Sequence, residues 1–161
     1  MVDLIGNKIP DIKLVKMDSE KGPQPLSVLD YCKDKKVVMF GVPGAFTPTC
    51  SRNHLPGFID KADEMKARGI DEVICFATND IFTLSAWEEM SGSIGKILFL
   101  SDSKAKFSKS IGTDFPDSFG TSTKTQRCSI LINDGTVERF FVEDDDGQVS
   151  ISSADNMLEN I

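Results

Sequence analysis

The feature that most constrains this chain is an abrupt change of pattern at the end of one apolar run. Residues 37–42 read VVMFGV, which is typical of a strand buried on both faces of a sheet. Pro43 and Gly44 end the run, and Thr47-Pro48 then favours a new helix. Threonine is a good N-cap, and proline suits the first helical position because its missing N–H is not needed there. The sequence therefore predicts a buried strand, a tight turn and a helix in direct succession.

Cys50 falls in the third position of this predicted helix, within its first turn. The free N–H groups and the dipole of a helix start favour negative charge, and the thiolate is the reactive form of cysteine. At such sites the pKa of a thiol can fall from about 8.5 to between about 3.5 and 7.5. Cys50 is therefore the candidate nucleophile, with a small apolar residue packed at a helix start as the simpler alternative.

The same residues carry a family resemblance. Pro43, Thr47 and Cys50 match the signature P-x-x-x-[TS]-x-x-C, and the string PGAFTPTCS…HLPGF resembles the type II, or peroxiredoxin-5-like, subgroup of the peroxiredoxins. Further matches are spread along nearly the whole chain: ICFATND at 74–80, Trp87, Arg127 followed by Cys128-Ser129, and SSAD at 152–155. The resemblance implies one thioredoxin-like domain over residues 1–161 and a thiol peroxidase. We expect no cofactor.

Apolar runs alternate with helix signals along the chain. The predicted strands cover 12–15, 37–42, 72–78, 97–100, 128–132 and 137–142. The last two are joined by Asn133-Asp134-Gly135, a strong hairpin signal. This order predicts an α/β fold with a central mixed β-sheet and helices on both faces. The resemblance sharpens the prediction to a three-layer, thioredoxin-like fold.

Other segments show no strand pattern. Residues 16–25 and 112–126 are polar and rich in turn-forming residues, so we expect loops, and the second is long enough to suggest a function. Residues 143–146 (EDDD) are expected to form a solvated acidic tip. Pro56-Gly57 predicts a bend in the helix that carries Cys50, since proline removes a backbone hydrogen bond.

Peroxide chemistry requires a partner for the thiolate. When the sulfur attacks one oxygen, charge builds on the departing oxygen, and the cysteine becomes a sulfenic acid. Arg127 matches the arginine of the family pattern, which implies that it stabilises the thiolate and the departing oxygen. A surface arginine paired with an acidic residue is the alternative. The resemblance also implies that Thr47 contacts the peroxide, besides capping the helix, and Pro43 is expected to shape the turn and shield the thiolate.

His54 is the only histidine and lies four residues after Cys50, so an unbroken helix would place both on one face. A papain-like pair of nucleophile and base is one interpretation, but the surrounding protease pattern is absent. We expect a structural or supporting role for His54. A metal site is disfavoured because these two residues supply only two ligands.

The remaining cysteines bear on how a sulfenic acid would be reduced. In one branch of the family a resolving cysteine lies near the C-terminus. The corresponding stretch here, QVSISSADNM, contains serines but no cysteine, which excludes a resolving cysteine of that kind. Cys75 lies where plant-like type II members also carry a cysteine, but a buried strand residue reaches a helix start only after local unfolding. Cys128 is expected to face away from Arg127, because side chains alternate along a strand. We therefore expect Cys50 alone to be catalytic, with glutathione/glutaredoxin or thioredoxin as the reductant.

Composition excludes several classes of protein. The formal net charge of −7 argues against nucleic acid as a partner, and no apolar run approaches the roughly 20 residues of a membrane span. The first residues lack the pattern of a transit or signal peptide, so we expect a cytoplasmic protein, although a trimmed leader would leave no trace.

Two rival functions and the oligomeric state stay open at this stage. A thioredoxin-like disulfide reductase is disfavoured because the chain has no C-x-x-C. A peroxide-sensing redox relay, or an interaction module without sustained turnover, is the alternative to an enzyme. The resemblance implies a homodimer built around the active-site face and involving Phe46, whereas Phe46 could instead pack in the core.

Overall fold

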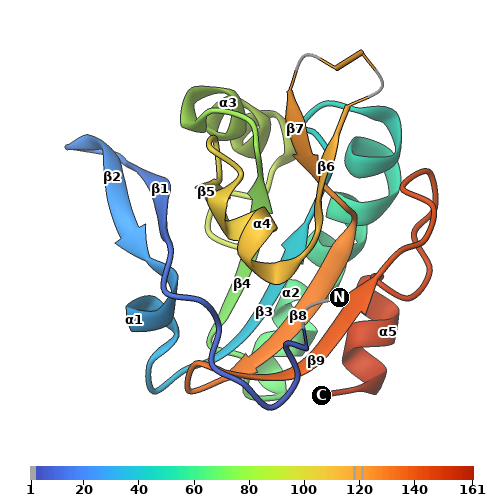
Figure 1. Cartoon of the computed structure of the whole chain (residues 1–161). Coiled ribbons are helices and arrows are strands. Elements are labelled where there is room, and N and C mark those ends of the chain that lie inside the picture. The colour runs from blue at the N-terminus through green and yellow to red at the C-terminus, as the bar shows by residue number, and fades with distance from the viewer. Residues whose placement is uncertain (1–2, 118, 121) are drawn as a thin grey trace.

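The computed structural model describes residues 3–117, 119–120 and 122–161. Its centre is a seven-stranded sheet in the order β2-β1-β5-β4-β3-β8-β9 (Figure 1). The strands are β1 (Lys13–Asp18), β2 (Gly22–Ser27), β3 (Lys36–Gly41), β4 (Glu72–Ala77), β5 (Leu98–Ser101), β8 (Cys128–Asn133) and β9 (Thr136–Val142). The pairs β3–β4 and β4–β5 are parallel and the other pairs antiparallel, which confirms the predicted mixed sheet.

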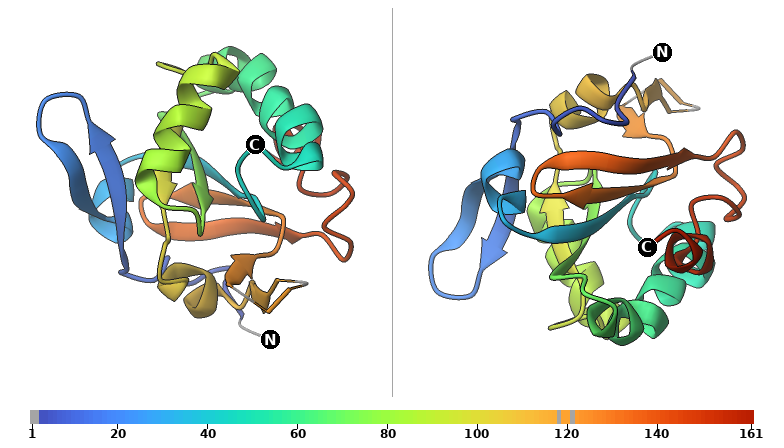
Figure 2. Two further views of the ribbon diagram at one scale, coloured as in Figure 1. Left: turned by 90° about the horizontal axis from the view of Figure 1, so that it is seen from above. Right: turned by 90° about the horizontal axis from the view of Figure 1, so that it is seen from below.

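Helices cover both faces of this sheet, as the two end-on views show (Figure 2). They are α1 (Val28–Cys32), α2 (Leu55–Ala67), α3 (Ile81–Ser91), α4 (Lys106–Ile111) and α5 (Ala154–Glu159), with the π-helix η1 (Cys50–His54) directly before α2. Buried side chains of α2, α3 and α5 form the core on one face, and those of α1 and α4 belong to the core on the other. The three-layer α/β architecture is thus confirmed.

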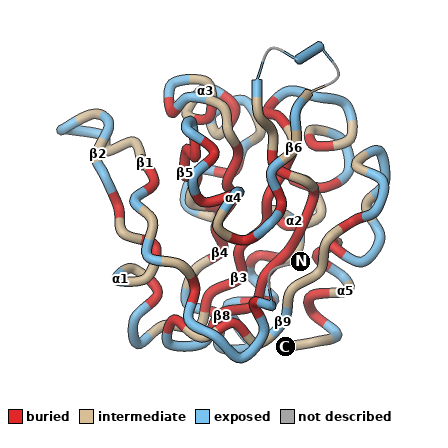
Figure 3. Tube along the Cα trace, in the orientation of Figure 1, coloured by how far each residue is buried: buried red, intermediate tan, exposed pale blue. Residues whose placement is uncertain are grey.

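The central strands β3 and β8 are buried at all but one terminal residue each, which explains their continuous apolar sequence (Figure 3). In β3, Val38 and Phe40 pack toward α2, whereas Val37 and Met39 pack toward the opposite layer. The Phe40 ring stacks on Phe58 of α2 with 4.0 Å between ring centroids. Because β3 and β8 are adjacent and antiparallel, the residues that follow β3 and the residue that precedes β8 are brought together at one end of these strands.

Two segments predicted to be loops contain strands. Residues 22–27 form β2, an edge strand that pairs with no strand other than β1 in the described part of the chain. The missing N–H groups of Pro23 and Pro25 therefore break no ladder. Within 112–126, β6 (Asp114–Pro116) and β7 (Thr123–Thr125) form a separate two-stranded hairpin. Residues 118 and 121 of that predicted loop lie outside the described residues. The turn-forming residues concealed β2 and the β6–β7 hairpin.

No helix in the described part of the chain has the length and apolar character needed to cross a membrane.

Candidate active site

The turn after β3 is held by hydrogen bonds at both of its ends. The N–H of Ala45 donates to Oδ1 of Asn79 at 2.9 Å, which ties the turn to the end of β4. The Thr47 hydroxyl donates to the carbonyl oxygen of Gly44 at 2.6 Å. Between them, Phe46 has a φ of +64°, a left-handed conformation that is costly for a large side chain. The turn is therefore closely specified by its neighbours.

The helix begins at Pro48 and places Cys50 in its third position, as predicted. The expected side-chain cap is wrong, however, because the Thr47 hydroxyl donates backwards instead of accepting from the first turn. Only the backbone carbonyl of Thr47 joins the helix, where it accepts from the N–H of Ser51 at 2.9 Å. The Thr47 side chain instead stabilises the turn before the helix.

The first part of the helix is widened into a π-helix over Cys50–His54. The N–H of Leu55 donates to the carbonyl oxygen of Cys50, five residues earlier. Pro56 follows directly, and it has no N–H to give to an α-helical bond. The irregularity that we predicted at Pro56-Gly57 therefore lies in the turn before that pair.

Arg127 directly precedes β8, and its side chain reaches the Cys50 sulfur. Its side chain is only 1% exposed, and each of its nitrogen atoms has a partner. Nε donates to the carbonyl oxygen of Asp146 at 3.0 Å, Nη1 donates to Nδ1 of His54 at 3.0 Å, and Nη2 donates to Sγ of Cys50 at 3.1 Å. The structure thus brings together the cysteine and the arginine that the sequence singled out.

His54 supports this arginine as a neutral ring. Because a guanidinium only donates and a carbonyl only accepts, Nδ1 must accept from Arg127 and Nε2–H must donate to the carbonyl oxygen of Ser152 at 3.0 Å. Burial, together with the charge of Arg127, lowers the pKa of His54 to about 3. The ring also packs edge-on against Phe40 and Phe58. With Nδ1 occupied, His54 is placed to orient Arg127 and not to accept a proton from a thiol.

The acidic segment 143–146 is the expected solvated tip only at Asp144 and Asp145, which are exposed, whereas Glu143 is buried and Asp146 is half-buried. Asp146 accepts from the backbone N–H of Arg127 through Oδ1 at 2.8 Å, besides its carbonyl contact with the guanidinium. Glu143 is 3% exposed, and its N–H donates to the carbonyl oxygen of Arg127 at 2.9 Å. Its carboxylate accepts four hydrogen bonds, from the N–H and hydroxyl groups of Ser150 and Ser152. The sequence offered one signal for this buried carboxylate that we did not use: Ser150 and Ser152 follow shortly after the acidic run and can donate to it.

These four hydrogen bonds predict a pH-dependent stability. Burial alone would raise the pKa of Glu143, but the bonds from Ser152 and Ser150 stabilise the carboxylate and hold its pKa at about 2, below the ordinary 4.5. The charged group therefore stabilises the folded protein above about pH 5, and this contribution is lost as the pH falls toward 2. Between pH 7 and pH 3, the wild type should lose about 2 kcal/mol more unfolding free energy than Glu143→Gln.

Urea denaturation at the two pH values measures this difference. Asp144→Asn, which removes an exposed charge from the same segment, is the matched control and should follow the wild type. If the unfolding free energies of the wild type and Glu143→Gln fell by the same amount between the two pH values, the buried carboxylate would contribute nothing to the pH dependence of stability.

A pocket of about 560 Å³ leads to this site. It is lined by the turn and helix start (Pro43, Thr47, Pro48, Thr49), by the β6–β7 hairpin (Phe115, Asp117, Phe119, Lys124) and by Arg127, Asp146 and Gly147. The Cys50 side chain is 0% exposed and lies behind this wall, in contact with the Nη2 group of Arg127. The sulfur is therefore kept from bulk water, and Arg127 connects it to the pocket.

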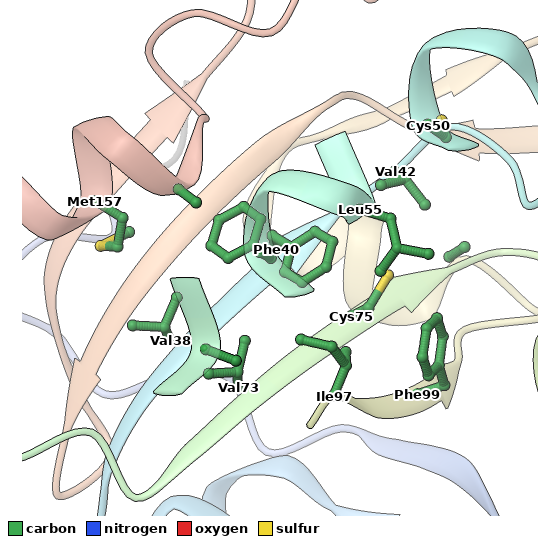
Figure 4. Close-up of a cluster of buried hydrophobic side chains, with 14 of the residues drawn as sticks. Val38, Phe40, Val42, Cys50, Leu55, Val73, Cys75, Ile97, Phe99 and Met157 are labelled. Atoms are coloured by element: carbon green, nitrogen blue, oxygen red, sulfur yellow. The ribbon is translucent and has the colours of Figure 1, made fainter. Parts of the chain in front are cut away.

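The other three cysteines are buried free thiols. Burial raises the pKa of Cys32 to about 11, that of Cys128 to about 12 and that of Cys75 well above its usual value. Cys128 packs in the core opposite Cys50, as expected from strand alternation. Cys75 lies on the same face as Cys50, but the side chains of Val42 and Leu55 lie between the two (Figure 4). The raised pKa values favour the protonated, less reactive form of each of the three thiols.

Within the described residues, no group of three or more His, Cys, Asp or Glu side chains is arranged to hold a metal ion.

The fold and the site define a class of protein: a thioredoxin-like α/β protein with a buried cysteine at a helix start, in contact with an arginine. Comparison with known proteins specifies it further. Residues 4–158 match the family model described as Redoxin. The chain is 38% identical over 157 residues to Peroxiredoxin-2B of Arabidopsis thaliana, and the match covers 96% of each chain. The chain belongs to the type II peroxiredoxins, and it is a thiol-dependent peroxidase.

Solved structures agree with this assignment. The crystal structure of reduced Prx3 from Vibrio vulnificus in complex with H2O2 superposes with a TM-score of 0.92, at 37% identity and 99% coverage of both chains. Peroxiredoxin 5 from Alvinella pompejana superposes with a TM-score of 0.76 at 30% identity, covering 88% of this chain and 90% of its own. The similarity therefore extends over the sheet, the helices and the Cys50 turn.

Proposed function

We propose that Cys50 is the peroxidatic nucleophile, which reduces hydrogen peroxide and alkyl hydroperoxides and is converted to a sulfenic acid. The observation that carries this proposal is the 3.1 Å contact from Nη2 of Arg127 to the Cys50 sulfur, at a helix start shielded from water. A guanidinium so placed stabilises the thiolate, and it is beside the oxygen that leaves. Both the attacking atom and the developing charge thus face the same cation.

The reaction proceeds by one displacement. The thiolate of Cys50 forms an S–O bond as the O–O bond breaks, and the electron pair leaves on the second oxygen as hydroxide or alkoxide, which then takes a proton. Thr47 and Pro43 line the pocket, and we assign them the positioning of the peroxide and the shielding of the sulfur. Because Cys50 is fully buried, a small rearrangement around its side chain must admit the peroxide.

An external thiol completes the cycle. Attack of a reductant thiolate on the sulfenic sulfur breaks the S–O bond and leaves a mixed disulfide, and the departing hydroxide takes a proton to become water. A second thiol then reduces the mixed disulfide. Glutathione with glutaredoxin, or thioredoxin, supplies these two thiols in our proposal. The burial of Cys75 beneath Val42 and Leu55 argues against an internal disulfide.

We also propose that the protein forms a homodimer through the active-site face. Phe46 is 46% exposed beside the pocket turn, with its ring centroid 6.3 Å from that of Trp87, so it does not simply fill the core. Burial of a large exposed ring against a second copy would remove its apolar surface from water. Sedimentation of the reduced protein measures this assembly.

Turnover distinguishes the enzyme from a sensor. With excess hydrogen peroxide and either reductant system, the wild type should consume many equivalents of peroxide, whereas a sensor is oxidised once and stops. Cys75→Ser should retain turnover within about twofold, since a buried thiol of raised pKa takes no part. Cys128→Ser, on the other face of the sheet, is the matched control. If Cys75→Ser were as inactive as Cys50→Ser, the single-cysteine cycle would be wrong.

A further inference from the structure

The β6–β7 hairpin forms the outer wall of the active-site pocket. Phe115 and Lys124 are directly opposed partners in its two strands, so their side chains lie on the same face of the hairpin. Both residues line the pocket. Figure 1 shows the hairpin beside the helix start that carries Cys50. The hairpin therefore presents an aromatic ring and an ammonium group side by side to anything that approaches the sulfur.

The pocket is much larger than hydrogen peroxide requires. A water molecule takes up about 30 Å³ in the liquid, and hydrogen peroxide is only slightly larger. A volume of about 560 Å³ instead lies in the range of sites that hold organic ligands. The apolar part of such a ligand has two rings to pack against, because Phe115 is half-buried in the wall and Phe119 is 88% exposed.

The charges on the pocket wall are not equivalent. Asp146 is bonded to the backbone N–H of Arg127, and the three guanidinium nitrogens of Arg127 all have partners. Asp117 accepts from the N–H of Phe119 at 3.1 Å and from the Ser122 hydroxyl at 2.9 Å. These groups are committed to holding the hairpin and the site.

Lys124 differs from these groups. Its ammonium group forms no ion pair with any residue in the described ranges. It lies over the active-site turn, 4.0 Å from the point where a Cβ on Gly44 would be. An anionic group of a ligand in the pocket would meet this cation close to the turn that covers Cys50.

We propose that the pocket selects organic hydroperoxides that carry a carboxylate or another anionic group. Lys124 pairs with the anion, Phe115 and Phe119 pack against the apolar body, and the hydroperoxide group reaches Cys50 beside Arg127. The proposal rests on the function assigned above and adds a preference among its substrates. Lys124 is thus a specificity-determining residue that acts on a part of the substrate remote from the reacting oxygens.

A matched pair of substrates tests this preference. A short-chain hydroperoxy fatty acid and its methyl ester have the same apolar body and the same hydroperoxide, and they differ in one charge. We expect the wild type to show a kcat/KM about fivefold higher for the acid than for the ester, and this ratio should fall as salt screens the pair. Lys124→Gln should bring the ratio to about one, and Lys124→Arg should restore it.

The controls separate this inference from the proposed function. Lys109→Gln removes a positive charge from α4, away from the pocket wall, and should leave the acid-to-ester ratio at the wild-type value. If the wild type reduces hydrogen peroxide but treats acid and ester alike, the inference is wrong and the peroxidase function stands. The inference is also wrong if Lys124→Gln lowers both rates equally. If the wild type consumes no peroxide at all, the proposed function fails and the inference fails with it.

Discussion

Cys50→Ser should abolish peroxide consumption, with a loss of at least about 10⁴-fold in kcat/KM under either reductant system. Serine is nearly isosteric, so the helix start and the contact region of Arg127 should stay folded while the nucleophile is lost. A neutral hydroxyl is a far weaker nucleophile than a thiolate, and no neighbouring base is free to activate it, because Nδ1 of His54 is occupied by Arg127. The variant therefore removes the nucleophile while it leaves the folded structure in place.

The measurement is peroxide consumption at equal folded concentration, checked by circular dichroism. The matched control is Cys32→Ser, since Cys32 is a buried free thiol in the core opposite Cys50. It should keep activity close to that of the wild type. Turnover by Cys50→Ser above one hundredth of the wild-type rate would assign the chemistry to another thiol, in which case Cys75 is the first to examine.

Arg127→Gln is expected to lower kcat/KM by about 10² to 10³-fold, the range seen when one preorganised donor to a developing negative charge is removed. Glutamine keeps a hydrogen-bond donor but lacks the charge and the reach to contact His54, Asp146 and Cys50 together. Because the arginine is buried and hydrogen-bonded, its loss also destabilises the fold, by about 1 to 3 kcal/mol for the partners left unsatisfied. Activity must therefore be expressed per folded molecule, with the folded fraction obtained from urea denaturation.

Two further variants sharpen this result. Arg127→Lys retains the charge without the planar fork and should recover only part of the activity. Arg52→Gln removes an exposed arginine from the same π-helix as Cys50 and should change the rate less than twofold. A loss smaller than tenfold in Arg127→Gln would mean that helix-start electrostatics suffice and that the guanidinium has a structural role.

The local sequence pattern was sufficient to predict several features of this protein. The apolar run 37–42 was long and uninterrupted because β3 is covered on both faces. Pro48 and the break at Pro43-Gly44 placed Cys50 in the correct helical position. Asp134-Gly135 marked the β8–β9 hairpin because both residues adopt positive φ there. Such features depend on neighbours in sequence, and the sequence therefore displays them.

Prediction from the local sequence pattern failed where strands are formed by polar or turn-forming residues. The prolines of β2 are tolerated only because that strand lies at the edge of the sheet. The β6–β7 hairpin is short and polar, and its pairing supplies the pocket wall that carries Phe115 and Lys124. The edge position of β2 and the pairing of β6 with β7 cannot be recognised before the place of these strands in the fold is known.

By itself the sequence determined most strands of the central sheet, the helical position of Cys50 and, through family resemblance, the pairing of that cysteine with Arg127. Only the tertiary structure decided what holds the pair in place. Cys50 and Arg127 are 77 residues apart, and the Ser152 carbonyl that orients His54 lies 98 residues from it in the chain. The carboxylate of Glu143 became an internal acceptor because folding brought two serines around it. Contacts between distant residues depend on how the sheet and helices pack, and no local pattern of residues encodes that packing.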